Sequence, residues 1–298
     1  MEGMEKRKIA AGIVTFNPDM ERLERSISLL LQNECLGCIY MADNFSDNIE
    51  DLRALEARVE KVMFIELNGN MGVAKALNRL CQRATTDGYE WLLTLDQDSL
   101  PESHLIDHLA QHIPCHSRQA SPLAILSPRI EDVNMGRMYS KKTQGSEYIK
   151  RCITAGSMIN LVCWQEVGGF DDALFIDGVD FDFCLRIQQH GFKIMRIYRV
   201  CIHQEIGRGR AINMGARRIA IMKHNPERMY YITRNYLAIG KRYHQQLSWA
   251  LEVLKRICIV VLFESHKLRN LTYFMKGIRD FERGKIGALA TKRKSKKK

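Results

Sequence analysis

Long hydrophobic runs are missing from this sequence of 298 residues. No window holds 18 uncharged apolar residues, about the length that crosses a bilayer as a helix, so we expect no transmembrane helix. The first residues, MEGMEKRKIAAGIVTF, lack the apolar core and the cleavage pattern of a signal peptide. From these two absences we expect a cytoplasmic protein.

A paired cysteine framework is also missing. The nine cysteines are odd in number and scattered, and Cys35 and Cys38 form a lone C-x-x-C with no second pair. A lone C-x-x-C is a weak metal or redox signal, and a boundary between helix and strand explains it more simply. Most of the others lie in apolar runs, which predicts reduced thiols packed in a core: Cys152, Cys163, Cys184, Cys201 and Cys258.

Positive charge is concentrated at one end of the chain. The formal net charge is +11, yet residues 1–206 carry 22 Lys and Arg against 29 Asp and Glu, and residues 207–298 carry 23 against 5. A basic tail on an acidic body predicts an anionic partner for the tail: membrane lipid, a phosphate-bearing substrate or nucleic acid. The acidic body argues against nucleic acid as its ligand.

The first hundred residues alternate apolar segments with helical patterns. The segments 9–16, 39–42, 62–67 and 91–95 have the composition of buried strands, and each is followed by a polar loop. Such alternation predicts right-handed βαβ crossovers and a mainly parallel sheet flanked by helices. Ligands of such sheets lie beyond the carboxyl ends of the strands. The polar groups at these ends are Thr15 to Asn17, Asp43-Asn44, Asn70 to Gly72 and Asp96 to Asp98.

Two carboxylates follow the fourth predicted strand. Asp96 and Asp98 are two positions apart, so they leave an extended strand on the same side. Like charges this close favour a cation between them, and Mg²⁺ prefers carboxylate and phosphate oxygens. The alternative is a solvated turn that caps the next helix.

Three further acids are clustered at 177–182. Asp180 could be a general base that takes a proton from a sugar hydroxyl, or an acid favoured by the dipole of a helix that begins there. Asp177 could be an N-cap, and Asp182 could pair with Arg186 one turn later. Upstream, Gly156 and Ser157 mark a place where the backbone could approach a ligand closely.

Basic residues downstream offer anion or metal contacts, each with a plainer explanation. His203 could be a ligand beside Asp98 or ordinary surface. Arg208 and Arg210 could clamp a diphosphate or be solvated. Arg234 could line an anionic site or belong to a packed amphipathic helix.

The C-terminal part predicts an amphipathic helix over 248–263, surrounded by basic residues, and a solvated basic tail over 292–298. This composition is typical of a helix lying at an anionic membrane surface, where each Lys or Arg near the lipid contributes about 1 kcal/mol. Burial of residues 245–263 against the rest of the chain is the alternative.

Seven motifs occur in an order that resembles the family 2 glycosyltransferases with the GT-A fold: TFN at 15–17, ADN-x-SD at 42–47, N-x-GVAKALN at 70–78, LDQDS at 95–99, AGSMINL at 155–161, GGFD at 168–171 and FIDGVDFDFCLR at 175–186. Within that family, the H-x-P-x-R-x-YY-x-x-RN pattern at 224–235 is most similar to bacterial rhamnosyltransferases of O-antigen and capsule assembly. The resemblance covers about residues 8–240.

The resemblance implies a GT-A, Rossmann-like domain over residues 1–240 and a helical, basic membrane-association extension over 241–298. It implies inverting, metal-dependent transfer of a sugar, most similar to L-rhamnose transfer from dTDP-rhamnose. The acceptor would be a lipid-linked oligosaccharide or another glycan in lipopolysaccharide O-antigen or capsule synthesis. The protein would lie at the inner face of the bacterial cell membrane.

The resemblance also implies roles for residues. Asp98 and His203 would hold Mg²⁺ or Mn²⁺, and Asp180 would be the base; Val179 departs from many relatives, which have an acid there, so Asp177 or Asp182 could share that role. The residues implied for nucleotide-sugar binding are Thr15, Asn17, Asp43, Asn44, Asn70, Gly72, Asp96, Gly156, Ser157, Arg208 and Arg234.

Three alternatives are open. The donor could be another nucleotide sugar, such as a UDP-hexose. A nucleotidyltransferase is disfavoured because residues 14–18, VTFNP, lack the Gly-rich phosphate loop and basic residue usual after the first strand of that class. The third alternative is a non-catalytic polybasic protein that binds a membrane through its basic tail alone.

Overall fold

The computed structural model describes residues 8–114, 123–132, 136–137, 142–204, 208–214, 217–223, 225–263 and 266–289; the side chains of 136–137, 208–214 and 217–223 lie outside this description. The chain divides into two compact units. The first comprises Met1–Asp171 and Val179–Lys223, and the second comprises Asp172–Gly178 and His224–Lys298.

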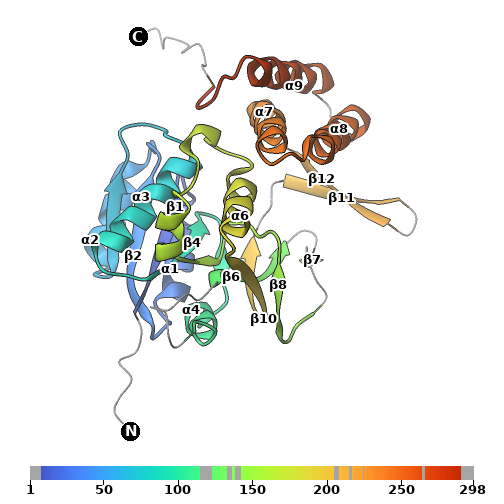
Figure 1. Cartoon of the computed structure of the whole chain (residues 1–298). Helices are drawn as coiled ribbons and strands as arrows, with labels where there is room; N and C mark the ends of the chain where they lie inside the picture. Colours follow the sequence, from blue (N-terminus) through green and yellow to red (C-terminus); the bar gives the residue numbers. More distant parts are fainter. Residues whose placement is uncertain are drawn as a thin grey trace, which may run out of the picture. The chain divides into compact units, whose positions relative to one another are not determined.

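The first unit is a mixed, mainly parallel sheet with helices on both faces (Figure 1). Its strands are β1 (Ile9–Thr15), β2 (Leu36–Asp43), β3 (Val62–Glu66), β4 (Trp91–Asp96), β5 (Leu100–Pro101), β6 (Leu123–Asp132), β7 (Gly136–Arg137), β8 (Ser146–Ile149), β9 (Ser157–Asn160) and β10 (Lys193–Gln204). Its helices are α1 (Met20–Leu30), α2 (Ile49–Arg58), α3 (Val73–Thr86), α4 (Leu105–Ala110), α5 (Leu161–Glu166) and α6 (Val179–Gln189). A separate hairpin pairs β11 (Arg208–Met214) with β12 (Arg217–Lys223).

The strand order is β3-β2-β1-β4-β9-β6-β10-β5. β3, β2, β1 and β4 pair in parallel, as do β6 and β10, whereas β9 is antiparallel to both β4 and β6. The predicted mainly parallel sheet flanked by helices is therefore confirmed. The insertion of β9 between the two parallel groups is not visible in the local sequence pattern.

Burial on both faces explains why the central strands have continuous apolar sequences. All seven residues of β1 are buried. A Cβ at Gly12 would lie 3.1 Å from Leu80 of α3, while Ile13 belongs to the core cluster that includes Leu23 of α1. Neighbouring residues of β1 therefore face helices on opposite sides of the sheet.

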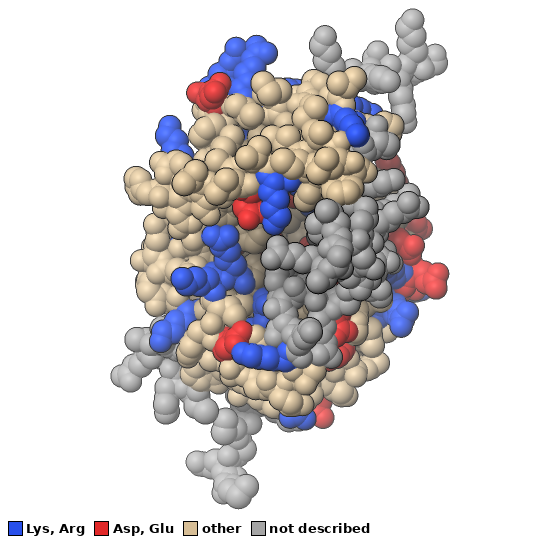
Figure 2. All heavy atoms as spheres, turned by 90° about the vertical axis from the view of Figure 1, so that its right-hand side faces the viewer, with Lys and Arg blue, Asp and Glu red and all other residues tan. Residues whose placement is uncertain are grey.

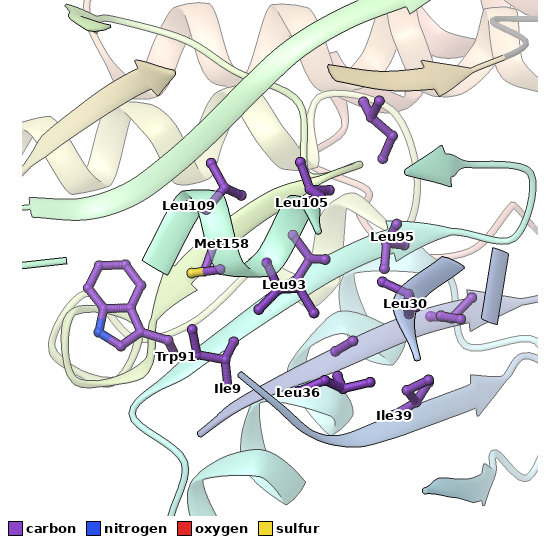
Figure 3. Packing of buried hydrophobic residues seen from close by; sticks show 14 of the residues in the cluster. Ile9, Leu30, Leu36, Ile39, Trp91, Leu93, Leu95, Leu105, Leu109 and Met158 are labelled. Atoms are coloured by element: carbon purple, nitrogen blue, oxygen red, sulfur yellow. The ribbon is translucent and has the colours of Figure 1, made fainter. Parts of the chain in front are cut away.

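The main core surrounds the strand that leads to the two carboxylates. Trp91, Leu93 and Leu95 of β4 pack with Ile9 and Met158 from the neighbouring strands (Figure 3). Side chains of α1 and α4 belong to the same core, and Leu105 and Leu109 of α4 are seen beside Leu93 and Met158 in Figure 3. The polar end of β4 is thus attached directly to this core.

The second unit contains a short 3-10 helix, η1 (Asp172–Leu174), and three helices, α7 (Pro226–Arg242), α8 (Gln246–Phe263) and α9 (Lys267–Glu282). Asn235 of α7 fastens the short segment by donating to the carbonyl oxygens of Leu174, Ile176 and Asp177 at 2.8, 2.8 and 2.7 Å. Within the part of the chain that is described, no helix is long and apolar enough to span a bilayer.

Two sequence predictions are refined here. Of the thiols predicted to pack in the core, four are buried, but Cys258 is exposed on α8, so that part of the prediction is wrong. The predicted domain boundary at residue 240 falls inside α7, which belongs to the second unit from its first residue; the division 1–240 and 241–298 stays a prediction.

Candidate functional site

Three polar strand ends lie side by side at one rim of the sheet. The parallel registers pair Thr15 with Asp43 and Val14 with Asp96. The carboxyl ends of β1, β2 and β4 therefore meet, as the βαβ pattern predicted, and the side chains that follow them share one edge.

Asp43 is a fully buried carboxylate that organises the loop after β2. It accepts hydrogen bonds from Thr15 Oγ1 at 2.8 Å, from Ser46 N at 2.8 Å and from Ser46 Oγ at 2.5 Å. Asn17 joins the network because its N–H donates to Ser46 Oγ at 2.7 Å and its Oδ1 accepts from Asp47 N at 2.6 Å. Thr15, Asn17 and Asp43 are thus brought together, and these hydrogen bonds fix the shape of two loops.

Asn44 fixes the loop before α3 by hydrogen bonds to its main chain. Its Oδ1 accepts from Met71 N at 3.1 Å, and its Nδ2 donates to the carbonyl of Gly72 at 3.4 Å. Asn70 Oδ1 accepts from Gly72 N at 3.1 Å, and Gly72, with φ of 85°, precedes the helix in a conformation that favours glycine. The start of α3 is therefore held against the end of β2.

Gln97, between the two carboxylates, was not anticipated as a site residue. Its Oε1 accepts from Phe16 N at 2.6 Å, and its Nε2 donates to Phe16 O at 3.2 Å. One amide thus joins the loop after β1 to the loop after β4. The only signal in the sequence is the position of an amide between two acids at a strand end.

Asp96 is held by a second unanticipated amide. Gln204 Nε2 donates to Asp96 Oδ2 at 2.9 Å, and the two residues are 108 positions apart. Gln204 ends β10 and is only 5% exposed. Nothing local in the sequence marks it, since its role depends on β10 reaching the rim.

Asp98 and His203 occupy adjoining segments. Arg22 Nε donates to the carbonyl of Asp98 at 2.8 Å, and the antiparallel pairing of β5 with β10 places His203 opposite Leu100. The Nδ1 atom of His203 lies 3.7 Å from Glu131 Oε2. The backbone of His203 thus runs beside the segment that follows Asp98, while its ring contacts an acid.

A group of possible metal ligands surrounds His203. Its ring, Glu102 and Cys201 have ligand atoms within 4.8 Å of one another. Burial raises the pKa of the Cys201 thiol to about 12, so that thiol is neutral near pH 7 and a weak ligand. Alternation along β10 turns His203 and Cys201 to the side opposite Gln204.

The donor chemistry at the rim fits a hard divalent cation. Asp98 is a half-buried carboxylate, and His203 is a half-exposed imidazole whose Nδ1 faces a carboxylate, the pattern usual for a metal-binding histidine. The group of possible ligands in the described residues joins His203 to Glu102 and Cys201, so binding of Mg²⁺ or Mn²⁺ by Asp98 and His203 stays a prediction.

Asp180 lies in the first turn of α6, as expected of a helix that begins near 179. Thr154 Oγ1 donates to Asp180 Oδ1 at 3.0 Å, and the carbonyl of Thr154 accepts from Thr94 Oγ1 at 2.7 Å. Asp180, Thr154 and Ser157 line one small hollow. These hydrogen bonds connect Asp180 through Thr154 to Thr94 of β4, two residues before Asp96.

Gly156 and Ser157 are both buried beside this connection. Gly156 N donates to Thr94 O at 2.7 Å, and a Cβ at Gly156 would come within 2.8 Å of Ile202 Cδ1. The close approach predicted for Gly156 is therefore made by protein side chains; a ligand contact stays a prediction.

The other two acids of the cluster are paired with arginines. Asp182 is fully buried and accepts from Arg186 Nε at 2.9 Å, which realises the predicted pairing one turn apart. Asp177, in the second unit, accepts from Arg228 NH2 at 2.6 Å and from Arg228 Nε at 3.2 Å. These pairings favour structural roles for both acids.

Arg234 is buried within the second unit at 2% exposure. It donates to the carbonyl oxygens of Gly287, Ala173 and Leu174 at 2.5, 3.3 and 3.2 Å, and its guanidinium lies 5.2 Å from the ring centroid of Tyr230. These contacts match the packed-helix alternative. The side chain of Arg208, on β11, lies outside the described residues.

The chain is similar to known proteins in sequence and in fold. Residues 11–160 match the family model described as Glycosyl transferase family 2. A protein of Shigella flexneri called dTDP-rhamnosyl transferase RfbF is 28% identical over 91% of this chain and 93% of its own.

Solved structures with similar folds are more distant in sequence. A crystal structure of GalNAc-T7 with UDP, GalNAc and Mn²⁺ matches with a TM-score of 0.63 at 13% identity over 94% of this chain, which spans 57% of that protein. S. aureus TarS, residues 1–349, matches with a TM-score of 0.59 at 13% identity over 92% of this chain and 80% of its own.

The contacts of Arg234 generate the first prediction. Arg234→Met should lower the free energy of unfolding by about 3 kcal/mol, because it leaves buried carbonyl oxygens without their donors. Chemical denaturation followed by circular dichroism measures the change. Lys241→Met, at an exposed position on the same helix, is the control and should change stability by less than about 0.5 kcal/mol. If Arg234→Met keeps wild-type stability but loses nucleotide affinity, the structural role is wrong.

Proposed function

The chain belongs to glycosyltransferase family 2 and has the GT-A fold, and from that membership we propose that it transfers L-rhamnose from dTDP-rhamnose to a glycan acceptor. The observation that carries the proposal is the rim, where Asp96 ends β4, Asp98 follows it, and Asp180 is connected to the same strand through Thr154. The choice of rhamnose is supported by similarity over most of the chain to a protein called a dTDP-rhamnosyl transferase.

Donor binding is assigned to the loops that the buried network fixes. Asp43 and Asn44 hold these loops in place before any ligand arrives, which lowers the entropy lost on binding. We assign the nucleoside to the edge formed by Thr15, Asn17 and Gly72, and the sugar to the side of Asp96.

Asp98, with His203, would hold a divalent cation on the diphosphate. When bound, such a cation neutralises negative charge that develops on the leaving nucleoside diphosphate. GalNAc-T7 was crystallised with Mn²⁺. For this chain, either Mg²⁺ or Mn²⁺ suits the oxygen and imidazole donors.

Asp180 is proposed as the base. Its carboxylate takes the proton of the acceptor hydroxyl while that oxygen forms a bond to the anomeric carbon. The bond from that carbon to the diphosphate oxygen breaks on the opposite face, and dTDP departs with the electron pair. Attack from the face opposite the leaving group inverts the anomeric configuration. Thr154 orients the carboxylate by donating to Oδ1.

The acceptor is proposed to be a lipid-linked oligosaccharide or another saccharide of bacterial O-antigen or capsule. A lipid-linked acceptor would require the enzyme to work at a membrane surface. The rhamnosyltransferase-like pattern at 224–235 and the apolar stripe on α8 support this choice of acceptor.

Helix α8 carries two apolar sides. Trp249 packs on Tyr236 of α7 with ring centroids 4.9 Å apart, and Val253 and Val260 are buried. A second stripe has alternating steps of four and three residues and comprises Leu247, Leu251, Leu254, Cys258 and Val261. Cys258 is exposed, and the other four residues are exposed by 75, 55, 53 and 40% respectively. A stripe of this kind next to basic residues is typical of an interfacial helix.

The exposed stripe is proposed to dock on the anionic inner face of the cell membrane. Lys255 stands beside it, and the sequence that follows continues strongly basic. Figure 2 shows Lys and Arg side chains spread among uncharged surface on one face of the molecule. Electrostatic attraction and burial of the leucines would act together at a lipid surface.

A donor screen tests the substrate. Purified protein should hydrolyse dTDP-rhamnose slowly in Mg²⁺ or Mn²⁺, at least about tenfold faster than UDP-glucose, UDP-galactose or UDP-GlcNAc. EDTA or Asp98→Ala should remove most of that rate, as measured by released dTDP. If dTDP-rhamnose is neither bound nor hydrolysed while a UDP-sugar is, the rhamnosyl proposal is wrong and family membership is unaffected.

Substitution of the base gives a sharper result. Asp180→Asn should lower sugar transfer from the donor to water by roughly 10²- to 10⁴-fold, because the amide cannot accept the proton. The calorimetric affinity for the donor should stay within about threefold. Asp177→Asn is the matched control and should retain most of the activity. A rate for Asp180→Asn comparable to wild type would remove Asp180 as the base.

Vesicle flotation tests the membrane surface. The protein should float with vesicles of phosphatidylcholine and phosphatidylglycerol, and less with phosphatidylcholine alone. The double substitution Leu251→Glu, Leu254→Glu should reduce binding at least roughly tenfold by removing apolar area from the stripe. Leu31→Glu, at a partly exposed leucine of the first unit, is the control. Equal binding of both variants contradicts the docking role of α8.

A further inference from the structure

Gln204 is a buried amide at the edge of the proposed donor site. It is the last residue of β10, and only 5% of its surface is exposed. Its Nε2 donates to Asp96 Oδ2 at 2.9 Å across 108 residues of sequence. Neither the sequence motifs nor the proposed mechanism gives this residue a role.

Hydrogen-bond chemistry fixes which way the amide faces. An ionised carboxylate only accepts hydrogen bonds, so the amide NH₂ must point toward Asp96 and the carbonyl oxygen must point elsewhere. Among the described residues, that carbonyl oxygen, Oε1, is buried and has no hydrogen-bond partner. Buried acceptors without a donor are rare in folded proteins, because they have lost their bonds to water.

The surroundings restrict what can satisfy Oε1. The parallel register places the buried Asp132 of β6 opposite Gln204, so a second acid lies on the strand next to this residue. A phosphate oxygen would meet an acceptor in Gln204 and a like charge in Asp96, which disfavours the diphosphate. A neutral hydroxyl can donate to Oε1 without charge repulsion. Among the parts of a nucleotide sugar, the hydroxyls fit best.

We propose that Gln204 binds the nucleotide-sugar donor directly: Oε1 accepts a hydrogen bond from a donor hydroxyl while Nε2 holds the Asp96 carboxylate in position. The inference rests on the proposed function, because it requires the rim to bind a nucleotide sugar. A donor that lacks this hydroxyl leaves Oε1 buried and unsatisfied, so Gln204 selects for donors that have it.

Calorimetric affinities for dTDP and dTDP-rhamnose test this role in three proteins. Gln204→Met keeps the length and most of the volume of the side chain but removes both hydrogen-bonding groups. Gln188→Met is the matched control, since among the described residues Gln188 of α6 donates to the main-chain carbonyls of Lys150 and Cys184 alone. Should Gln204→Met not fold, Gln204→Asn, which withdraws the same amide by one methylene, replaces it.

Gln204→Met should weaken dTDP-rhamnose binding roughly tenfold, while Gln188→Met binds like wild type. If dTDP binding is unchanged, the hydroxyl lies on the rhamnose; if dTDP binding weakens equally, it lies on the deoxyribose. A deoxy-sugar analogue adds a double-mutant cycle: wild type should bind the analogue of the responsible hydroxyl more weakly than the parent, and Gln204→Met should bind the two equally.

Equal affinity of Gln204→Met and Gln188→Met for both ligands overturns the inference and leaves the proposed function intact. If wild type binds another nucleotide sugar instead, the rhamnosyl proposal fails, and the same comparison with that sugar decides the role of Gln204. If wild type binds no nucleotide sugar, the inference fails together with the proposed function.

Discussion

The parallel pairing of β4 with β1 is the constraint on which the rim depends. It sets Val14 opposite Asp96 and so brings the loop after β1 beside the two carboxylates. A shift of one residue would turn Asp96 to the other face of the sheet and move each buried β4 side chain from one packed layer to the other. The packing of Leu93 and Leu95 in the core makes such a shift costly. The core that stabilises the unit is therefore also what orients its chemistry.

Two amide side chains hold the rim together in addition to the pairing of its strands. Gln97 bonds both main-chain groups of Phe16, and Gln204 bonds Asp96. Each links segments that the sheet brings close but does not itself connect. Because these amides are neutral, they can join loops beside several carboxylates without adding charge to the proposed donor site. A preformed rim of this kind loses little entropy when a donor binds.

Partners distinguish the three acids near residue 180. A buried carboxylate is stable as an ion only if a cation or several donors compensate for its lost hydration. Asp182 and Asp177 each have an arginine at hydrogen-bonding distance, whereas Asp180 accepts from the hydroxyl of Thr154. Asp177 and Asp182 are thus each fixed by a guanidinium, whereas Asp180 is connected to β4 through Thr154.

The sequence by itself determined the order of strands and helices, the polar loops at their ends and the family. These are local properties: apolar runs such as 91–95, loop residues such as Asn70 to Gly72, and motifs a few residues long. It also predicted that Thr15, Asp43 and Asp96 would share a rim, because parallel strands end together.

The tertiary structure alone decided which side chains meet across the fold. Gln204 donates a hydrogen bond to Asp96, which is 108 positions away in the sequence. Arg234 donates to carbonyl oxygens of residues 53 to 61 positions away. His203 faces Glu131 only because β10 pairs with β6. No periodicity encodes these contacts, since they depend on which strands become neighbours and in what register. Burial then decides the role of each polar group, because a partner is required wherever water is excluded.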